Sequence, residues 1–473
     1  MGEAFPRFPQ GFLWGAATAS YQIEGAVTEG GRGVSIWDTF SHTPGRTDQG
    51  DTGDVACDHY HRYVEDVALL RDLGVGAYRF SVAWPRVQPD GRGHVNPEGL
   101  AFYGRLIDEL LDAGITPVAT LYHWDLPQAL EDTGGWRSRD TAHRFADYAA
   151  DVHAALGDRV QTWITLNEPF CAGFVGYAEG RHAPGAQEGA GALAAVHHLL
   201  LGHGLAVAAL RAQQRTGDQI GITLNLADVR AASDSPADRA AARRSGCQQN
   251  LAFTDPILAG RYPESEAETW PWLAGDLPFR QDDDLATISA PIDFLGVNTY
   301  FPFVAAAGMH DEPDSAARTA ADIAVTSVLP ADLPRTAMGW PIDPTIMSGV
   351  LGWLHAHYPG LPPVYITENG AAFDDAPDAD GRVRDDARIG YLDAHLRDLH
   401  AAIGAGVDVR GYFCWSLLDN FEWAHGYGKR FGLVRVDYPT QTRTPKDSYA
   451  WYRDIVSSYR PARPAGDGGW PGR

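Results

Sequence analysis

The chain has 473 residues, which is long for one domain, and its composition is that of a globular protein. Hydrophobic residues make up 44% of it and charged residues 21%, so a disordered, collagen-like or coiled-coil protein is excluded. The 38 basic and 61 acidic side chains give a formal net charge of −23. Because such a chain is repelled by phosphate backbones and by anionic lipids, we expect it to bind neither nucleic acid nor membranes.

The cysteines and the N-terminal segment indicate the cellular compartment in which the protein is expected. Cys57, Cys171, Cys247 and Cys414 are scattered with no C-x-x-C pair, so we expect them to be reduced, buried and packed as small hydrophobes. The apolar run at 12–19 is too short for a signal peptide and lacks a basic leader, which indicates a strand instead. No stretch is expected to be long and apolar enough to span a membrane. These features predict a cytoplasmic protein.

One unit recurs along the chain: an amphipathic helix, a glycine and then a short apolar strand. Apolar residues at helical spacing end at Gly74, at Gly114, at Gly157, and at Gly404 with Gly406. Glycine suits a helix end because it adopts the left-handed conformation without a side-chain clash. The strands that follow these helices are predicted at 78–82, 118–121, 160–164 and 411–415, and further strands at 12–18, 220–226, 294–300 and 364–367.

Eight strands joined mostly by helical segments predict an α/β fold, a single (β/α)8 barrel over residues 1–459. The alternative is a doubly wound open sheet, which would carry a glycine-rich phosphate loop after its first strand. Neither G-x-G-x-x-G nor G-x-x-x-x-G-K-[ST] stands there. The segment 301–344 is expected to be a loop that covers the barrel mouth, and the Pro- and Gly-rich segment 460–473 a disordered tail.

In such a barrel, chemistry lies at the C-terminal ends of the strands and in the loops that follow them. The chain also has 14 Trp, and stacking on the flat, partly apolar face of a sugar is one use for so many rings. The predicted strand ends carry polar and aromatic residues that a core alone does not need, namely Gln22, Arg79, His123, Trp124, Asn167, Glu168, Asn298, Tyr300, Glu368, Asn369 and Trp415.

Two of these residues, Glu168 and Glu368, each follow directly after a β-rich apolar run. A lone glutamate at a strand end is most often simply solvated. The strands that precede these two lie across the predicted barrel from one another, so their carboxyl groups can face each other over a pocket. Two facing carboxyl groups, one a neutral acid and one an anion, are what cleavage of a glycosidic bond requires.

From Phe8 to about Tyr459 the sequence resembles glycoside hydrolase family one, the β-glucosidase family. The motifs that carry the resemblance are FLWGAATASYQIEG at 12–25, YRFS at 78–81, LNEP at 166–169, ITENG at 366–370 and WSLLDNFEW at 415–423. The resemblance implies a retaining β-glycosidase on a (β/α)8 barrel. It also implies a small-molecule β-glycoside as substrate, with neither a metal nor an organic cofactor.

The resemblance further implies a role for each matched residue. Glu368 matches the nucleophile and Glu168 the acid/base, while Arg79 and Tyr300 match the residues that keep the nucleophile ionised through charge and a hydrogen bond. Asn167 matches the residue that binds the sugar 2-hydroxyl. The remaining sugar-binding positions are matched by Gln22, His123, Asn298, Trp340, Trp415, Glu422, Trp423 and Phe431. Taken singly, Trp124 and Trp340 are better explained by packing.

Two features of other enzymes are absent from the sequence pattern. The segment that begins near Asp378 lacks calcium ligands at the first and twelfth loop positions. His197, His198 and His203 lie on a predicted helix without the register or acidic partners of a zinc motif.

Other functions stay open at this point. The 6-phospho-β-glycosidases of the same family bind phosphate through a Ser, a Lys and a Tyr, and here those positions hold Glu422, Lys429 and Phe431. A carboxylate at Glu422 repels phosphate, so unphosphorylated sugar is expected. A non-catalytic sugar-binding protein of this fold would have lost one of the two glutamates, whereas a transglycosylase would share every catalytic residue. The sequence does not distinguish glucose from galactose or fucose.

Overall fold

The structure is a computed structural model that describes residues 4–272, 277–308 and 319–459. Eight parallel strands close into a barrel in the order β1-β11-β10-β7-β5-β4-β3-β2, which confirms the (β/α)8 fold. The tail predicted at 460–473 lies outside the described residues. The barrel strands are β1 (Leu13–Ala17), β2 (Ala77–Ser81), β3 (Thr116–Tyr122), β4 (Thr162–Asn167), β5 (Gln219–Asn225), β7 (Phe294–Asn298), β10 (Val364–Asn369) and β11 (Val409–Trp415).

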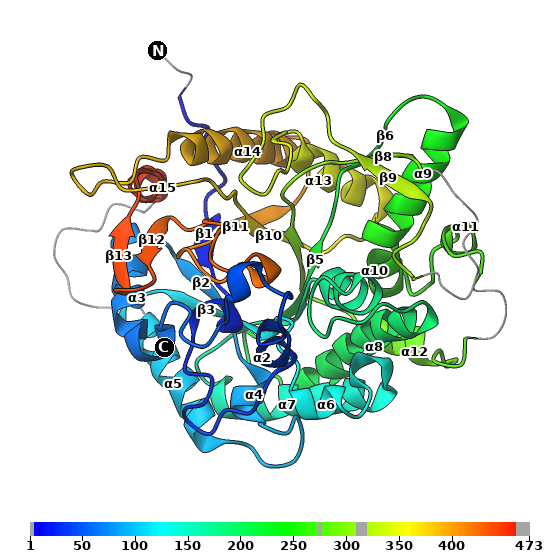
Figure 1. Ribbon diagram of the computed structural model, residues 1–473, viewed down its shortest axis with the longest axis horizontal. Coiled ribbons are helices and arrows are strands. Elements are labelled where there is room, and N and C mark those ends of the chain that lie inside the picture. The colour runs from blue at the N-terminus through cyan, green and yellow to red at the C-terminus, as the bar shows by residue number, and fades with distance from the viewer. Residues whose placement is uncertain (1–3, 273–276, 309–318, 460–473) are drawn as a thin grey trace.

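The longer helices lie around the outside of the barrel (Figure 1). They are α3 (His59–Leu73), α5 (Pro97–Asp112), α7 (Arg139–Leu156), α8 (Ala190–Ala212), α9 (Pro236–Gly246), α13 (Ile346–His357), α14 (Asp386–Gly404) and α15 (Asp447–Ser458). The shorter helical segments are α1 (Ser20–Ile23), α2 (Ile36–Ser41), η1 (Asp48–Gly50), α4 (Trp84–Val87), α6 (Gln128–Glu131), η2 (Gly135–Arg137), η3 (Cys171–Glu179), η4 (Cys247–Leu251), α10 (Ala252–Thr254), η5 (Asp255–Ala259), α11 (Glu266–Thr269), α12 (Asp284–Ile288) and η7 (Trp423–His425). A hairpin, β12 (Val434–Asp437) with β13 (Thr442–Pro445), follows the last barrel strand.

Two details of the predicted repeat are wrong. Gly74, Gly114 and Gly406 are left-handed as expected, with φ of 82°, 73° and 105°, but Gly157 has φ of −69° and Gly404 lies within α14. The fourth strand begins at Thr162 rather than at Val160, because the Val160 N–H still bonds to a carbonyl of α7. The polar ends of that strand and of β10 are as predicted, because Asn167 closes β4 and Glu368 lies near the end of β10.

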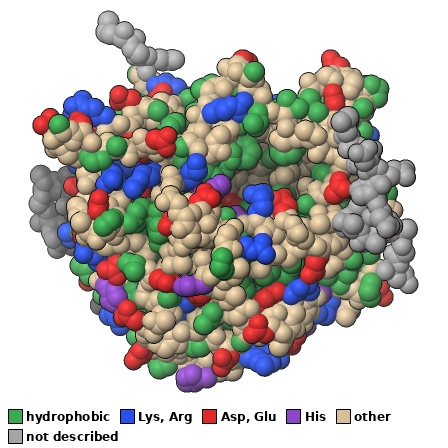
Figure 2. All heavy atoms as spheres, viewed as in Figure 1, with side chains coloured by type: hydrophobic (Ala, Val, Ile, Leu, Met, Phe, Trp, Pro, Cys, Tyr) green, Lys and Arg blue, Asp and Glu red, His purple; other side chains and the backbone are tan. Residues whose placement is uncertain are grey.

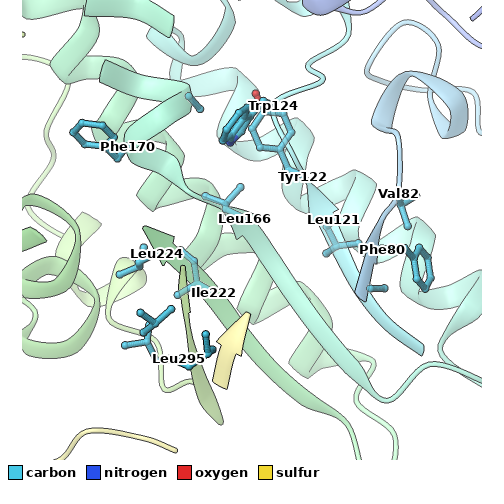
Figure 3. Packing of buried hydrophobic residues seen from close by; sticks show 14 of the residues in the cluster. Phe80, Val82, Leu121, Tyr122, Trp124, Leu166, Phe170, Ile222, Leu224 and Leu295 are labelled. Carbon is cyan, nitrogen blue, oxygen red and sulfur yellow. The ribbon is translucent and has the colours of Figure 1, made fainter. Parts of the chain in front are cut away.

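Apolar side chains form one layer outside the barrel and another inside it. Outward-facing residues of neighbouring strands, among them Leu121, Leu166, Ile222 and Leu295, pack in the larger cluster (Figure 3). A second cluster inside the barrel includes Val118, Ile164, Phe294, Phe413 and Trp415. The inner layer has room for large rings because glycine faces them: a Cβ on Gly15 would lie 2.4 Å from the Phe413 ring. The barrel is therefore a packed core that closes the floor beneath its C-terminal end.

The segment 301–344 is not the loop that was expected. It contributes β8 (Phe303–Ala307) and β9 (Val325–Val328), which join β6 (Val229–Ala231) in a three-stranded sheet beside α9 (Figure 1). The β-branched and aromatic residues of these two strands favour pairing, a signal that the Ala, Asp and Pro around them obscured. Trp340 and its immediate neighbours do pack at the barrel mouth.

The expectation that no stretch could span a membrane was wrong for α8. This helix is long and apolar enough by length and composition, but 83% of its apolar window is buried inside the fold. It packs against α7 and η3, so its composition is that of a helix enclosed by neighbours.

Figure 2 shows a hollow near the middle of the face seen in Figure 1, with acidic and basic side chains interspersed around it.

Candidate active site

Glu368 lies near the end of β10 with its carboxylate buried between two donors. Arg79 on β2 donates from Nη1 to Oε1 at 2.5 Å, and the Tyr300 hydroxyl donates to Oε2 at 2.5 Å. Only 3% of Glu368 is exposed. A guanidinium charge and two hydrogen bonds stabilise the ionised carboxylate, which is the form able to attack an electrophilic carbon.

Glu168 follows β4 in a left-handed conformation, with φ of 47°, and its carboxyl group has weaker partners. Asn298 donates from Nδ2 to Oε1 at 2.6 Å, and the Cys171 thiol donates to Oε2 at 3.1 Å. Burial, and next to it the negative charge of Glu368, raise the pKa of Glu168 to about 8. A pKa of about 8 makes this group mainly a neutral acid at neutral pH, the form that can give a proton to a leaving group.

One hydrogen-bond network joins the two carboxyl groups. Arg79 also donates from Nη2 to Oδ1 of Asn167 at 2.6 Å, and Asn298 donates to the same oxygen at 3.1 Å. A guanidinium can only donate, so the Asn167 atom that faces Arg79 must be the amide oxygen. The Nδ2 of Asn167 then faces Nε2 of His123, 3.1 Å away. Burial, and then the charge of Arg79, hold the pKa of His123 well below its ordinary value, so its Nε2 is free to accept.

Glu422 and Gln22 supply buried polar atoms that no group in the described part of the chain satisfies. Oε2 of Glu422 and Oε1 of Gln22 are buried without a hydrogen-bond partner, although Nε2 of Gln22 donates to the Phe421 carbonyl at 2.9 Å. Burial, then the charges of Glu368 and Glu168, raise the pKa of Glu422 to about 8. A buried oxygen without a partner costs free energy, and a hydroxyl of a bound ligand would satisfy it.

Aromatic rings surround these polar groups. The rings of Trp415 and Trp423 stack on His123 at 6.0 and 5.9 Å, and those of Trp340 and Tyr300 lie 5.9 and 6.3 Å from Phe431. Together they bound the space beside the carboxyl groups with flat apolar surfaces. Trp124, interpreted above as packing, donates from Nε1 to the Asn167 carbonyl at 2.9 Å and so holds the backbone next to Glu168.

The structure also brings residues to the site that the sequence reasoning missed. Thr367 donates to Oδ1 of Asn298 at 2.7 Å, and His182 packs its ring against Trp124 at 5.4 Å. Cys171 was expected to be a small buried hydrophobe, but it is partly exposed and contacts Glu168. Its position three residues after Glu168, which follows β4, was the available signal, because a turn there returns the side chain to that glutamate.

Other polar clusters lie outside the site. His197, His198 and His203 on α8 have separate partners, Asp284, the Trp136 carbonyl and Thr165. No group of three or more His, Cys, Asp or Glu arranged to hold a metal occurs within the described ranges. A cavity of about 500 Å³ lies between α9 and α13, but neither Glu168 nor Glu368 lines it.

Comparisons with known proteins find matches along nearly the whole chain. Residues 5–460 match the family model described as Glycosyl hydrolase family 1. The chain is 53% identical over 457 residues to the thermostable β-glucosidase B of Thermobispora bispora, covering 95% of this chain and 90% of that protein. It is 49% identical to a bifunctional β-D-glucosidase/β-D-fucosidase of Bifidobacterium breve, covering 96% and 98%. The psychrophilic β-glucosidase of Micrococcus antarcticus superposes with a TM-score of 0.91 at 49% identity, covering 96% and 98%.

Fold and site together define a barrel enzyme of the glycosyl hydrolase class. The chain belongs to glycosyl hydrolase family 1.

Proposed function

We propose that the protein is a retaining β-glucosidase that removes the non-reducing terminal β-linked glucose of small β-glycosides and cello-oligosaccharides. The observation that carries the proposal is the different surroundings of two linked, buried glutamates. Arg79 and Tyr300 stabilise the anion at Glu368, while burial beside that anion keeps Glu168 protonated. This is the asymmetry that a double displacement needs.

In the first step, an oxygen of Glu368 forms a bond to the anomeric carbon as the bond to the leaving-group oxygen breaks. Glu168 gives its proton to that oxygen, so the leaving group departs as an alcohol. Forming the glycosyl ester removes the negative charge of Glu368, and with it one cause of the raised pKa of Glu168. Glu168 then takes a proton from water, which attacks the anomeric carbon and releases Glu368.

The other matched residues bind the sugar in this proposal. Asn167 is placed for the 2-hydroxyl, a contact that strengthens in the oxocarbenium-like transition state. Gln22, His123, Asn298, Glu422 and Trp423 bind further hydroxyls, Trp415 lies under the apolar sugar face, and Trp340 and Phe431 bound the leaving-group side. The relatives reported above are named β-glucosidases, which favours glucose as the sugar removed. The Bifidobacterium breve relative is also named a β-D-fucosidase, which adds fucose as a second candidate sugar.

A 6-phosphorylated sugar is the second candidate, and the surroundings of Lys429 argue against it. The Lys429 ammonium already donates to the Ala337 carbonyl at 2.7 Å. Glu422 stands at the family's phosphate-binding serine position, and its pKa of about 8 means that it repels a phosphate dianion only as pH rises toward and above 8. We further propose a cytoplasmic enzyme of cellulose breakdown that acts on short, soluble β-glucosides.

Azide rescue of the two glutamate variants tests the roles. In Glu368→Ala, azide should enter the vacated side, attack an activated β-glucoside directly and give the α-glucosyl azide. In Glu168→Ala, the sugar first becomes attached to Glu368, so azide should give the β-glucosyl azide. Products of reversed configuration would exchange the two roles, and full activity in both variants would place the site elsewhere.

A further inference from the structure

The carboxyl group of Glu168 has one contact that the proposed mechanism does not use, the thiol of Cys171 at 3.1 Å from Oε2. The local backbone builds this contact. Glu168 is left-handed, the Cys171 N–H donates to the Glu168 carbonyl at 2.9 Å, and helix η3 begins at Cys171. The turn therefore returns the side chain of residue 171 to the carboxyl group three residues before it.

The two oxygens of Glu168 are not equivalent, because the Asn298 amide has a fixed orientation. Its Oδ1 accepts from the Thr367 hydroxyl at 2.7 Å, and its Nδ2 donates to Oδ1 of Asn167, the oxygen that also accepts from Arg79. Since the guanidinium can only donate, the direction of the whole chain is set. Oε1 of Glu168 then faces a donor, and the proton of the neutral acid belongs on Oε2, beside the thiol.

A thiol can form a hydrogen bond with Oε2 whether the carboxyl group is ionised or neutral, because S–H is a weak donor and sulfur is a weak acceptor. Toward the ionised carboxylate the thiol donates. Toward the neutral acid it offers sulfur, and Asn225 donates from Nδ2 to that sulfur at 3.8 Å. Burial, and then the charge of Glu168, hold the pKa of the Cys171 thiol well above its ordinary value. Cys171 therefore remains a thiol at working pH and does not become a nucleophile.

We propose that Cys171 is a positioning residue for the acid/base: it holds Oε2 of Glu168 in place and, by donating only weakly to the ionised form, sets the pH at which the acid is lost. The inference rests on the proposed function, in which Glu168 is the acid. The charged and titratable groups around Glu168 on other elements are Glu368, Arg79, Tyr300, Glu422 and, through Asn167, His123. We expect these groups to stay in place when Cys171 is changed.

The test is the pH profile of kcat/KM on a glucoside with a poor leaving group, in Cys171→Ala and Cys171→Ser. Alanine removes the donor, so the alkaline limb should move up by about 0.5 pH unit, a gain of about threefold one unit above the wild-type limb. Serine is a stronger donor, so the limb should move down by about as much. Cys247→Ser, which makes the same exchange at a buried cysteine of η4, is the matched control and should leave the limb in place.

Several outcomes would overturn the inference. The assigned role is wrong if both Cys171 variants fold and the alkaline limb of kcat/KM stays in place in both. It is equally wrong if the limb moves in the same direction in both. Glu168→Gln is run in the same series: if it keeps the alkaline limb, the proposed function itself fails, whereas if it loses the limb while the Cys171 variants do not shift it, only this inference fails.

If neither Cys171 variant folds, the inference can be tested on the wild-type protein by pH-difference infrared spectra in the S–H stretching region. A band should shift with a midpoint at the alkaline limb, as the thiol becomes donor to the ionised carboxylate. A band that does not change through that pH overturns the inference.

Discussion

Replacing Glu168 with Gln should stabilise the fold, by an amount that grows with pH. Folding raises the pKa of Glu168 from 4.5 to about 8, chiefly through burial and then through the charge of Glu368. When the pKa of a carboxyl group is higher in the folded than in the unfolded protein, the group does not lower stability at pH values below its unfolded pKa, because it is protonated in both states. As pH rises from the unfolded pKa to the folded pKa, only the unfolded state loses the proton, so the free energy of unfolding falls. Glutamine does not titrate, so the variant escapes this loss.

The size of the effect follows from the shift. At about 1.4 kcal/mol per pKa unit, a rise from 4.5 to about 8 sets a ceiling of about 5 kcal/mol above pH 8. Between pH 5 and pH 7, the advantage of Glu168→Gln over wild type should grow by about 2–3 kcal/mol. The amide oxygen can still accept from Asn298, so little of this gain is lost to a broken hydrogen bond.

Urea denaturation of both proteins at pH 5, 6, 7 and 8 and constant ionic strength measures the difference in unfolding free energy. Glu65→Gln, which removes an exposed carboxylate of α3, is the matched control. A stability difference that is flat or falls with pH would refute the reasoning that burial and Glu368 together keep Glu168 protonated.

Three further results are expected from steady-state kinetics. The profile of kcat/KM against pH should fall on its alkaline side near pH 8, where Glu168 loses its proton, and Glu168→Gln should remove that limb; a limb that persists unchanged belongs to another group. Tyr300→Phe removes a hydrogen bond to ionised Glu368 worth about 1.5–3 kcal/mol and should lower kcat/KM roughly ten- to hundredfold; wild-type activity would deny Tyr300 that role. Glu422→Ser should lower activity on free glucosides and weaken the exclusion of 6-phosphoglucosides, and no change on either substrate would rule out the proposed contact.

The periodic part of the fold could be predicted from the sequence, because each barrel strand is a short apolar run. The two-residue error at the fourth strand arose because Val160 is apolar but still bonded to the preceding helix. The strand β8 was missed because its partner β6 lies some 70 residues earlier in the chain, and β9 was missed with it because β9 pairs only with β8 among the described strands. The apolar character of α8 gave no sign of whether other helices or lipid cover it.

At the site, motif order identified the residues that the structure brings together around Glu168 and Glu368. It did not give the direction of the hydrogen bonds that make the two carboxyl groups different. That direction originates at Arg79, which reaches both Glu368 and Asn167 from a third strand, and only closure of the barrel places these groups within reach. The Cys171 contact was missed although the three-residue spacing from Glu168 could be read from the sequence; the left-handed backbone of Glu168 could not.

The central claim is that Glu368 becomes covalently attached to the sugar during turnover. A 2-deoxy-2-fluoro-β-glucoside with a good leaving group should trap this intermediate, because the electron-withdrawing fluorine slows both steps while the leaving group keeps the first one accessible. Peptide mass spectrometry of the inactivated enzyme should then find one fluoroglucosyl group, attached to Glu368. A label on Glu168 or Glu422, or inactivation without any covalent label, would contradict the account.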